Sequence, residues 1–384
     1  VQAVKAVKQN YKPTPEILAL LEEFRRMVNE CIQIGLAGNI TSMKSLSQKA
    51  YHQLEKHPIP TYYRLTAISK ATGILRNYKQ TLKKHPMAKK PYASKLMLTD
   101  CYAFKVEEGK LRLPLKAREY AFIPLNSHVL RSIQGYTVRS VCLTACTLSI
   151  AFSKETAQIE PTELIGIDRN LDNITVAFSN SETKRFDLSK ATEIKAKYRE
   201  VKSHFKRNDV RIRKRIFGKY GRKQRNRVNQ MLHCVSKRIV ERAKAERLGI
   251  VMENIKGIQK LYRKGNGQGT QYRSKLNGWS FYELQRQIEY KAKWEGILVI
   301  LVSAHKTSSV CAVCGSEIAE CTERKVYCPR CLRAMDRDVN AALNIRQRGM
   351  RFVPNGFACE AVRGNPELVI LRADANKLTH HSKS

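Results

Sequence analysis

Hydrophobic positions in the first quarter of the chain follow first the period of a strand and then that of helices. Alternation over residues 1–8 predicts a short strand. Thr14 is a candidate helix cap, and from there hydrophobic residues recur at helical spacing until Gly35, which is well placed to end the helix. The same spacing predicts two further helices, over residues 42–55 and 61–84.

The period returns to two over residues 97–153. Alternating hydrophobic residues on both sides of Glu108-Gly109 predict a hairpin, and residues 141–149 predict a further strand. A strand, a helical insert and then more strands indicate a small β-barrel that is interrupted by helices.

From residue 162 onward, short apolar runs alternate with helical stretches. The runs predict buried strands over residues 164–167, 174–178, 184–186, 249–252 and 297–301. A very basic helical stretch over residues 189–246 follows the third strand, and a helix over residues 281–294 precedes the last. The Gly-rich segment of residues 264–279 is expected to be a mobile loop. The second half of the chain is therefore expected to be mixed α/β.

Three acidic residues stand at the ends of these elements. Asp168 and Glu253 each follow a buried strand directly, and Asp338 is expected at the start of a helix. Taken singly, Asp168 fits a strand-end carboxylate, Glu253 a surface charge and Asp338 a helix cap. Taken together, their order and setting match an RNase H-like core, in which converging carboxylates hold two Mg²⁺ ions for phosphodiester hydrolysis. We therefore predict a two-metal site at these three residues.

Five cysteines lie between residues 311 and 331, and four of them have the spacing of a metal site. Cys311 and Cys314 are followed, after thirteen residues, by Cys328 and Cys331. In a reducing cytosol, such a cluster indicates metal rather than disulfides. Four thiolates close the coordination sphere of a zinc ion, so the spacing predicts a structural Zn²⁺ site. Cys321 is left without a role.

The net charge of the chain indicates which class of partner it binds. Its 384 residues include 71 Lys or Arg and 33 Asp or Glu, which gives a net charge of +38. Such an excess favours a polyanionic partner, and the 42% of hydrophobic residues exclude a disordered basic tail. No apolar run approaches the roughly 18 residues of a membrane helix, and no secretory signal is recognisable. We therefore expect a cytoplasmic protein without a membrane partner.

The positive charge is concentrated in residues 199–227, where thirteen Lys or Arg stand against two acids. A charge run is commonly only a solvated helix face, but this one is interleaved with aromatic residues and repels itself without an anionic partner. Contact with nucleic-acid phosphates is the preferred interpretation. The candidate contact residues are Arg207, Arg211, Arg213, Lys214, Arg215, Lys219, Arg222, Lys223, Arg225 and Arg227.

The motifs of the second half occur in the order of a known family. They are Gly166-Ile167-Asp168, Leu232-His233 with Ser236 and Ile239-Val240, Ile250 to Glu253, Tyr290-Lys291-Ala292, Thr307-Ser308 before Cys311 and Cys314, and Asp336-Arg337-Asp338 with Asn340 and Asn344. In this order, the chain resembles the TnpB family of transposon-encoded proteins, which is ancestral to type V CRISPR effectors. The resemblance covers residues 160–348 by motif.

The resemblance implies an RNA-guided DNA endonuclease. Its partners would be a guide RNA derived from the transposon end and double-stranded target DNA carrying a short transposon-adjacent motif, and it would cut in a single RuvC site. The site would use Asp168, Glu253 and Asp338 with Mg²⁺, and the zinc module would help to handle nucleic acid nearby.

The implied architecture is an α+β multidomain chain. An N-terminal wedge β-barrel with a helical recognition insert precedes an RNase H-like (RuvC) α/β nuclease core with an inserted zinc-ribbon module. The expected boundaries are residues 1–10 for the first wedge strand, 11–95 for the recognition lobe, 96–160 for the remaining wedge strands, 161–300 for the RuvC core, 301–334 for the zinc module, 335–350 for the final RuvC segment and 351–384 for a C-terminal tail.

Three positions bear on how closely the family pattern is followed. Many members have Leu-Gly where this chain has Arg169-Asn170, and Gly where it has Leu332. The first departure changes the neighbour of a catalytic acid, and the second alters the turn of the second cysteine pair. The family pattern favours Asp338 as the metal ligand and leaves Asp336 as a cap or supporting residue.

Three other functions remain compatible with parts of this pattern. A miniature type V CRISPR effector would carry the same motifs. A non-cleaving RNA-guided DNA-binding protein is disfavoured because all three acids are present. A DDE transposase would suit the carboxylates but not the other motifs. A monomer is the favoured oligomeric state.

Overall fold

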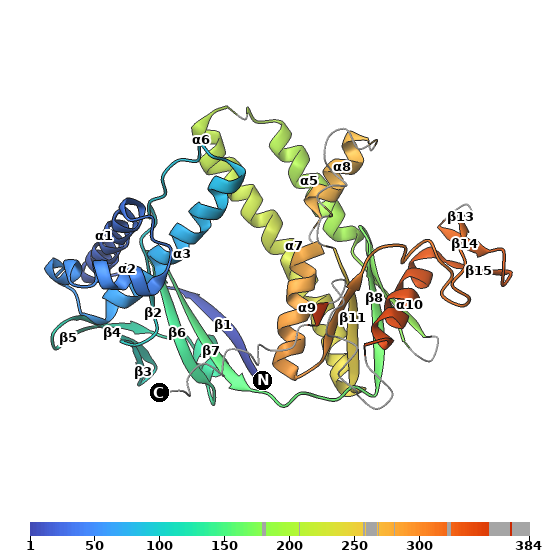
Figure 1. The fold of residues 1–384 in the computed structure, drawn as a ribbon, viewed down its shortest axis with the longest axis horizontal. Helices are drawn as coiled ribbons and strands as arrows, with labels where there is room; N and C mark the ends of the chain where they lie inside the picture. The colour runs from blue at the N-terminus through green and yellow to red at the C-terminus, as the bar shows by residue number, and fades with distance from the viewer. Residues whose placement is uncertain are drawn as a thin grey trace. The chain divides into compact units, whose positions relative to one another are not determined.

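The chain divides into two compact units, which are described separately (Figure 1). One unit comprises Val4–Lys154, and the other comprises Val1–Ala3 together with the chain from Glu155 onward. This computed structural model describes residues 1–178, 182–206, 208–255, 258, 267, 269–279, 281–320, 324–352 and 369–370. Both units combine helices and strands, so the predicted α+β class is confirmed.

The strands of the first unit form two sheets, with the orders β1-β7-β6-β2 and β3-β4-β5. Their bounds are β1 Gln2–Asn10, β2 Met97–Asp100, β3 Lys105–Glu107, β4 Lys110–Lys116, β5 Glu119–Pro124, β6 Thr137–Thr144 and β7 Thr147–Glu155. The predicted hairpin at Glu108-Gly109 is the turn between β3 and β4, which pair antiparallel. Within residues 1–155, which are all described, no strand pairing joins the two sheets, and the predicted small barrel stays a prediction.

The helices of this unit are α1 Pro15–Ala37, α2 Met43–Ala50, the short 3₁₀ turn η1 Gln53–Lys56, α3 Tyr62–Lys84 and α4 Ser127–Ile133. Thr14 caps α1 as predicted, because its side chain accepts a hydrogen bond from the Ile17 backbone N–H. The predicted end at Gly35 is wrong, since α1 continues to Ala37. Gly35 instead lets α3 approach closely: a Cβ there would lie 2.3 Å from Leu75 Cδ1. The predicted helix over residues 42–55 is broken into α2 and η1.

A six-stranded sheet forms the core of the second unit, in the order β10-β9-β8-β11-β12-β16. The bounds are β8 Glu163–Arg169, β9 Asn173–Ala177, β10 Thr183–Asp187, β11 Leu248–Asn254, β12 Val299–Ser303 and β16 Val369–Ile370. Strands β8, β9 and β10 form the predicted antiparallel meander, whereas β8, β11 and β12 run parallel. The five predicted strands are therefore present, with small shifts at their ends.

Helices cover both faces of this sheet. Helices α5 Ser189–Ser203, α7 Gly218–Ala245 and α9 Phe281–Glu295 pack on one face, against apolar residues that include Ile165 and Ile167. Helix α10 Arg337–Met350 packs on the other face through Ile345. The approach of α10 requires Gly166, because a Cβ there would lie 2.0 Å from the carbonyl oxygen of Ala342.

Two predictions about the helices of this unit are wrong. The basic stretch is not one helix: α5 ends at Ser203, and a new start capped by Asp209 leads through α6 Val210–Ile212 and a π-helical segment, Arg213–Phe217, into α7. The expected Gly-rich loop contains helix α8 Thr270–Gly278, whose Leu276 packs into the core. In residues 270–278, burial of Leu276 therefore outweighs the preference for a loop that the glycines indicated.

Beyond Phe352 the structure describes only β16, so the expected C-terminal tail lies almost entirely outside the described residues. Within the described part of the chain, no helix has the length and apolar character needed to cross a membrane.

Candidate functional site

Asp168 and Glu253 occupy neighbouring positions at the same end of two parallel strands. Strands β8 and β11 are in register up to the pair Ile167 and Met252, and each acid is the next residue on its strand. Because side chains alternate along a strand, both acids project to the face opposite to Ile167 and Met252, which is the face that α10 covers. Register and alternation alone thus bring two distant carboxylates together.

Asp338 reaches the same place from the first turn of α10. Asp336 caps this helix, since its carboxylate accepts hydrogen bonds from the backbone N–H groups of Asp338 at 2.9 Å and Val339 at 3.1 Å. The carboxylate of Asp338 accepts a hydrogen bond from Asn173 Nδ2 on β9 at 3.4 Å. Asp338 is only 3% exposed, and Asp168 is 8% exposed. The cap therefore explains Asp336 and leaves Asp338 inside the cluster.

The charges of the three acids influence one another. Burial, and then the carboxylates of Glu253 and Asp338, raise the pKa of Asp168 from 3.8 to about 7. Asn170 Nδ2 opposes this shift by donating to Asp168 Oδ2 at 2.7 Å. Burial also raises the pKa of Glu253, against a hydrogen bond from Thr307 Oγ1 to its Oε1 at 2.5 Å. Buried acid clusters of this kind are typical of cation sites.

Oxygen donors of this kind suit Mg²⁺, but the three acids do not all close on one point. Among the described residues, only the four cysteines bring three or more ligand atoms within 4.8 Å of one another. A single ion touching Asp168, Glu253 and Asp338 together therefore does not fit this arrangement.

Two arginines that the sequence did not single out contact Asp338. Arg324 Nη2 donates to its Oδ1 at 3.0 Å, and Arg185 Nη2 lies 3.4 Å from its Oδ2. Arg324 comes from the cysteine module and Arg185 from β10, where it also donates to Asp336 at 2.8 Å. These guanidinium groups compensate one carboxylate of the cluster from its solvent side.

A third arginine, Arg169, lies on the opposite side of the cluster. Its guanidinium donates to the backbone carbonyl of Glu253 and to Gln285 Oε1 on α9, the latter at 2.9 Å. Burial lowers its pKa to about 10, and the charges of Glu253 and Asp168 oppose that shift, so it stays cationic at neutral pH. An arginine within a buried strand was a visible signal in the sequence, since such a charge needs nearby acids.

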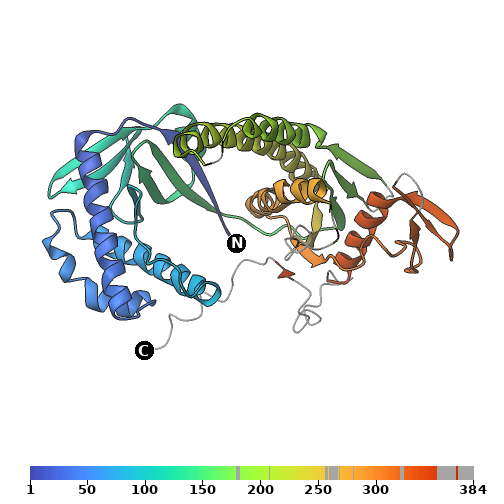
Figure 2. The ribbon, with the colours of Figure 1, turned by 90° about the horizontal axis from the view of Figure 1, so that it is seen from above.

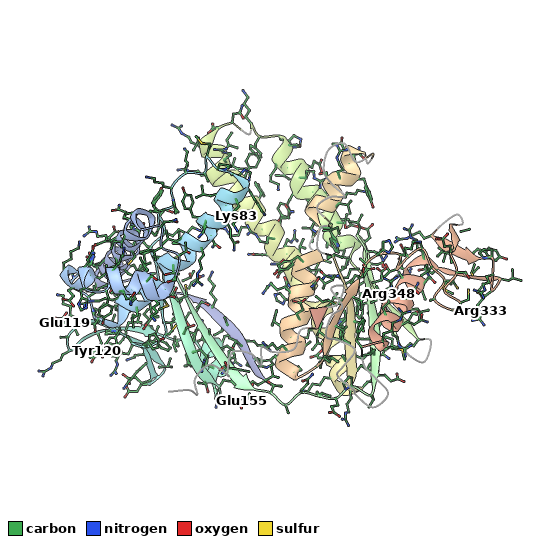
Figure 3. The ribbon with its side chains drawn as sticks, in the orientation of Figure 1. Lys83, Glu119, Tyr120, Glu155, Arg333 and Arg348 are labelled. Atoms are coloured by element: carbon green, nitrogen blue, oxygen red, sulfur yellow. The ribbon has the colours of Figure 1, made fainter. Side chains whose placement is uncertain are left out.

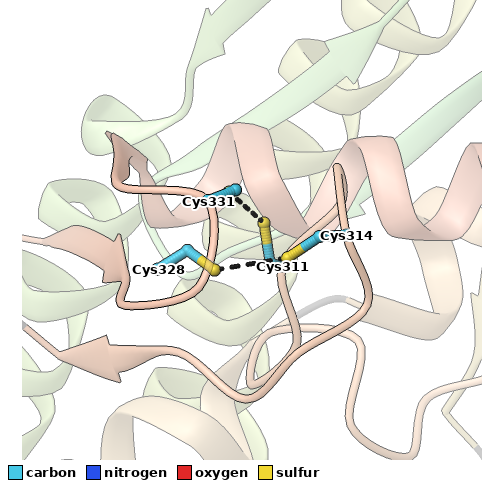
Figure 4. A group of neighbouring side chains, drawn as sticks. All are labelled: Cys311, Cys314, Cys328 and Cys331. Carbon is cyan, nitrogen blue, oxygen red and sulfur yellow. Dashed lines mark hydrogen bonds between the residues drawn. The ribbon is translucent and has the colours of Figure 1, made fainter.

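The four predicted zinc ligands lie together (Figure 4). The sulfur atoms of Cys311 and Cys331 are 3.6 Å apart, and those of Cys314 and Cys328 are 3.4 Å apart. The module also contains the small antiparallel sheet of β13 Ala319–Glu320, β14 Lys325–Cys328 and β15 Arg333–Asp336. Cys321 lies outside the described residues.

Helix α10 contains Asp338 and also binds the cysteine module through hydrogen bonds from two asparagines. Asn340 Oδ1 accepts from the backbone N–H of Ala312, and Asn340 Nδ2 donates to the carbonyl of Val310. Asn344 Nδ2 donates to the carbonyls of Val310 and Thr307. Figure 3 shows Arg348 further along this helix, where its Nη1 donates to the carbonyl at the end of β12. The polar face of α10 thus fixes the module relative to the acids.

Replacing Leu332 with Gly is expected to stabilise the cysteine module by about 1 kcal/mol, because Leu332 adopts a left-handed conformation with φ of 55° and is 72% exposed. The midpoint of urea unfolding, followed by a probe in the module, measures the change. Gly315→Ala at φ of 73° is the matched reverse test and should lower that midpoint. A Leu332→Gly protein less stable than the parent would contradict the strain argument.

The described basic candidates lie in α6, the π-helical segment and the first part of α7, and α7 runs beside α5 (Figure 2). Arg211, Arg213, Arg215, Lys219, Arg222, Lys223, Arg225 and Arg227 are exposed. Arg207 and the side chain of Lys214 lie outside what the structure describes. The rings of Tyr198 and Tyr220 join the two helices at 6.0 Å, and Lys202 donates to Gln224 at 3.1 Å. The cations thus form an extended surface rather than a pocket.

Comparison with known proteins shows which proteins the chain is similar to. Residues 281–345 match the family model of the Cas12f1-like TNB domain. A TnpB-like protein of Methanocaldococcus jannaschii is 27% identical over 257 residues, which cover 63% of this chain and 91% of the relative. The CRISPR-associated endodeoxyribonuclease Cas12f2 of a Micrarchaeota archaeon is 34% identical over 134 residues, covering 32% of this chain and 24% of that protein.

A solved structure extends the comparison to the fold. The cryo-EM structure of a Cas12f1–sgRNA–target DNA complex superposes with a TM-score of 0.62 at 14% identity, over 86% of this chain and 82% of that one. The protein therefore has the fold of the compact Cas12f effectors. By its motifs and its relatives, the chain is similar to TnpB-like proteins and to Cas12f endodeoxyribonucleases.

Proposed function

We propose that the protein is an RNA-guided DNA endonuclease of an insertion sequence, which recognises a short transposon-adjacent motif and hydrolyses guide-complementary DNA in a RuvC site. The observation that carries this proposal is the proximity of Asp168, Glu253 and Asp338, which come from distant parts of the chain and influence one another's charge. The similarity to TnpB-like proteins and to Cas12f nucleases supports it.

In this proposal, Asp168, Glu253 and Asp338 hold two Mg²⁺ ions. Bound in this way, Mg²⁺ would lower the pKa of an attacking water and stabilise the charge of the leaving oxygen. The chain itself orients the acids: Asn170 fixes Asp168, Thr307 fixes Glu253, and Arg169 holds the backbone at Glu253. Arg324 and Arg185 hold Asp338 and would meet the phosphates of an entering strand at the solvent side.

The partners in this proposal are a guide RNA and double-stranded target DNA. The net charge of +38 and the exposed cations of α6, the π-helical segment and α7 supply the electrostatic footprint for both. The relative whose structure was solved in complex carries an sgRNA and a target DNA. We assign residues 1–10 and 96–160 to the wedge, 11–95 to the recognition lobe, 161–300 and 335–350 to the RuvC nuclease, and 301–334 to a zinc ribbon.

We assign a structural Zn²⁺ to Cys311, Cys314, Cys328 and Cys331. Four sulfur donors that already lie within 4.8 Å of one another suit a tetrahedral ion and leave no open position for a substrate. The part of the zinc ribbon in this account is to hold Arg324 and the start of α10 in place beside the acids.

Mg²⁺ is expected to stabilise the protein more strongly at about pH 8 than at about pH 6. The pKa of Asp168 is raised from 3.8 to about 7 in the folded protein. Without metal, the protonated Asp168 therefore contributes to the stability of the fold, and this contribution is lost as pH rises through about 7. Because Mg²⁺ binds the ionised carboxylates, it should restore the stability that the folded protein loses at the higher pH. Thermal unfolding with and without Mg²⁺ measures this. An equal shift at both pH values would contradict the assignment.

A miniature type V CRISPR effector is the second candidate, and the match of residues 281–345 to the Cas12f1-like TNB model favours it. The chemistry would be unchanged, and only the origin of the guide would differ. Sequencing the RNA that co-purifies with the protein tests both candidates. A discrete RNA derived from a transposon end supports the main proposal, whereas repeat-derived RNA supports the second. The absence of any discrete RNA would count against guided cleavage altogether.

A further inference from the structure

The sheet β3-β4-β5 has one buried and one outward face, which its pairing register defines. Val106, Leu111 and Ile123 are cross-strand neighbours, as are Leu113 and Ala121, and they form the inner face. The opposite, outer face carries the other neighbours that precede the register shift after Pro114: Lys105, Arg112 and Phe122 in one row, Glu107, Lys110 and Pro124 in a second, and the buried Pro114 with Tyr120 in a third. Beyond the shift, Lys116 pairs with Glu119. All of these residues belong to the unit Val4–Lys154.

Two aromatic side chains on the outer face are open to solvent. Tyr120 is 44% exposed and Phe122 is 52% exposed, and both lie on β5 with one residue between them. Figure 3 shows Tyr120 beside Glu119 on this strand. Residues two apart on a strand project to the same face about 7 Å apart. The rings are thus two separate flat surfaces rather than one stacked pair.

Cations surround these rings. The guanidinium of Arg112 lies over the Tyr120 ring, 4.6 Å from its centroid, and is held from the side by Glu107 at 3.0 Å. Lys105 and Lys110 are exposed on the same face. Three cations therefore stand against one acid around two exposed rings. Bases stack on aromatic rings and phosphates pair with neighbouring cations in sheet-face sites for unpaired nucleotides.

We propose that the outer face of β3-β4-β5 binds unpaired nucleotides of RNA, with one base on Tyr120, one on Phe122 and the adjoining phosphates on Arg112, Lys105 and Lys110. The proposal deepens the proposed function, because it locates contacts of the RNA partner. Stacking on a sheet face does not depend on base pairing, so the occupant is a single-stranded segment such as a loop or bulge rather than a duplex.

A second copy of the chain is a poor occupant of this face. Two half-exposed rings offer on the order of 200 Å² of apolar surface, against about 800 Å² per partner in a stable interface. A second copy would also bring a body of net charge +38 against three cations. Area and charge both favour the polyanion.

The test measures binding of RNA to the full chain, in two forms. The first is the complex with its own co-purified RNA, in which ultraviolet crosslinks are mapped to residues. The second is protein freed of RNA, titrated with a fluorescent oligouridine and with a duplex RNA of equal length. The variant Tyr120→Ala with Phe122→Ala is compared with Tyr120→Phe and with Tyr92→Ala, an exposed tyrosine elsewhere in the same unit.

We expect the double variant to bind oligouridine about tenfold or more weakly, with little change for the duplex, and to lose crosslinks on β5. Tyr120→Phe and Tyr92→Ala should bind as the parent does. Unchanged oligouridine affinity in the double variant would overturn the proposal, as would a change in oligomeric state on mutation. If the parent brings down no RNA, the proposed function fails, while the oligouridine titration still decides this inference.

Discussion

Replacing Asp168 with Asn is expected to reduce guided DNA cleavage by about a thousandfold or more, because the metal-held charge supplies several kcal/mol of transition-state stabilisation. Burial and the charges of Glu253 and Asp338 raise the pKa of Asp168 even though the charge of Arg169 opposes that shift. Asn keeps the volume and the contact with Asn170 but removes the charge. RNA-dependent binding of the target should therefore remain. Cleavage and binding are measured on the same labelled duplex.

The matched control is Asp172→Asn. Asp172 lies four residues further along, is exposed, and accepts a hydrogen bond from Thr192 Oγ1 at 2.7 Å. Its neutralisation should leave cleavage unchanged, so any loss in the Asp168 variant reports on the site rather than on the general charge of the protein. An Asp168→Asn protein that cuts as fast as the parent would remove the basis of the site assignment.

Replacing Cys328 with Ser is expected to release the zinc and to abolish cleavage with it. Structural zinc contributes on the order of 10 kcal/mol to small modules of this kind, which cannot fold on their apolar residues alone. Arg324 directly precedes β14, which ends at Cys328, and Asn340 and Asn344 bind the module from α10. Loss of the module would therefore free both Arg324 and the start of α10 beside Asp338.

Zinc content by elemental analysis and cleavage by gel assay are measured together. Cys146→Ser is the control, because Cys146 is exposed in the other unit and is far from the cluster in sequence. It should keep both zinc and activity. A Cys328→Ser protein that lacks zinc but cuts normally would contradict the positioning role of the module, though not the identity of the ligands.

The acids were predictable from sequence because strand pairing does most of the positioning. Asp168 and Glu253 end apolar runs, and parallel register then makes them neighbours without further information. Asp338 was predictable as a helix-start acid, although only the cap geometry separates it from Asp336. The cysteine cluster was predictable from its spacing, since two close pairs can reach one ion in almost any local fold.

Contacts that depend on strand pairing within the cysteine module, or on the register of β10, were not predictable. Arg324 reaches Asp338 because β14 pairs with β15, which places Lys325 opposite Asp336 and so brings the preceding residue to the start of α10. Nothing in the local sequence distinguishes this arginine from the many others. Arg185 depends in the same way on the register of β10.

The errors in the helices have the same origin. Gly35 carried a local stop signal, but tertiary packing against Leu75 uses it for close approach instead. The glycines before residue 270 suggested a loop throughout, whereas Leu276 found a place in the core and its neighbours formed a helix. Local signals thus predicted the elements well where packing agreed with them and failed where packing decided.

The most direct test of the central claim is cleavage of a double-stranded DNA by the purified protein with its own RNA in Mg²⁺. The substrate carries the sequence complementary to the guide beside the adjacent motif, and the control carries the same motif beside a scrambled sequence. We expect cutting of the matched DNA alone, its loss in EDTA, and its recovery when Mg²⁺ is restored. Equal cutting of both DNAs, or no cutting of the matched DNA by an RNA-loaded protein, would contradict the account.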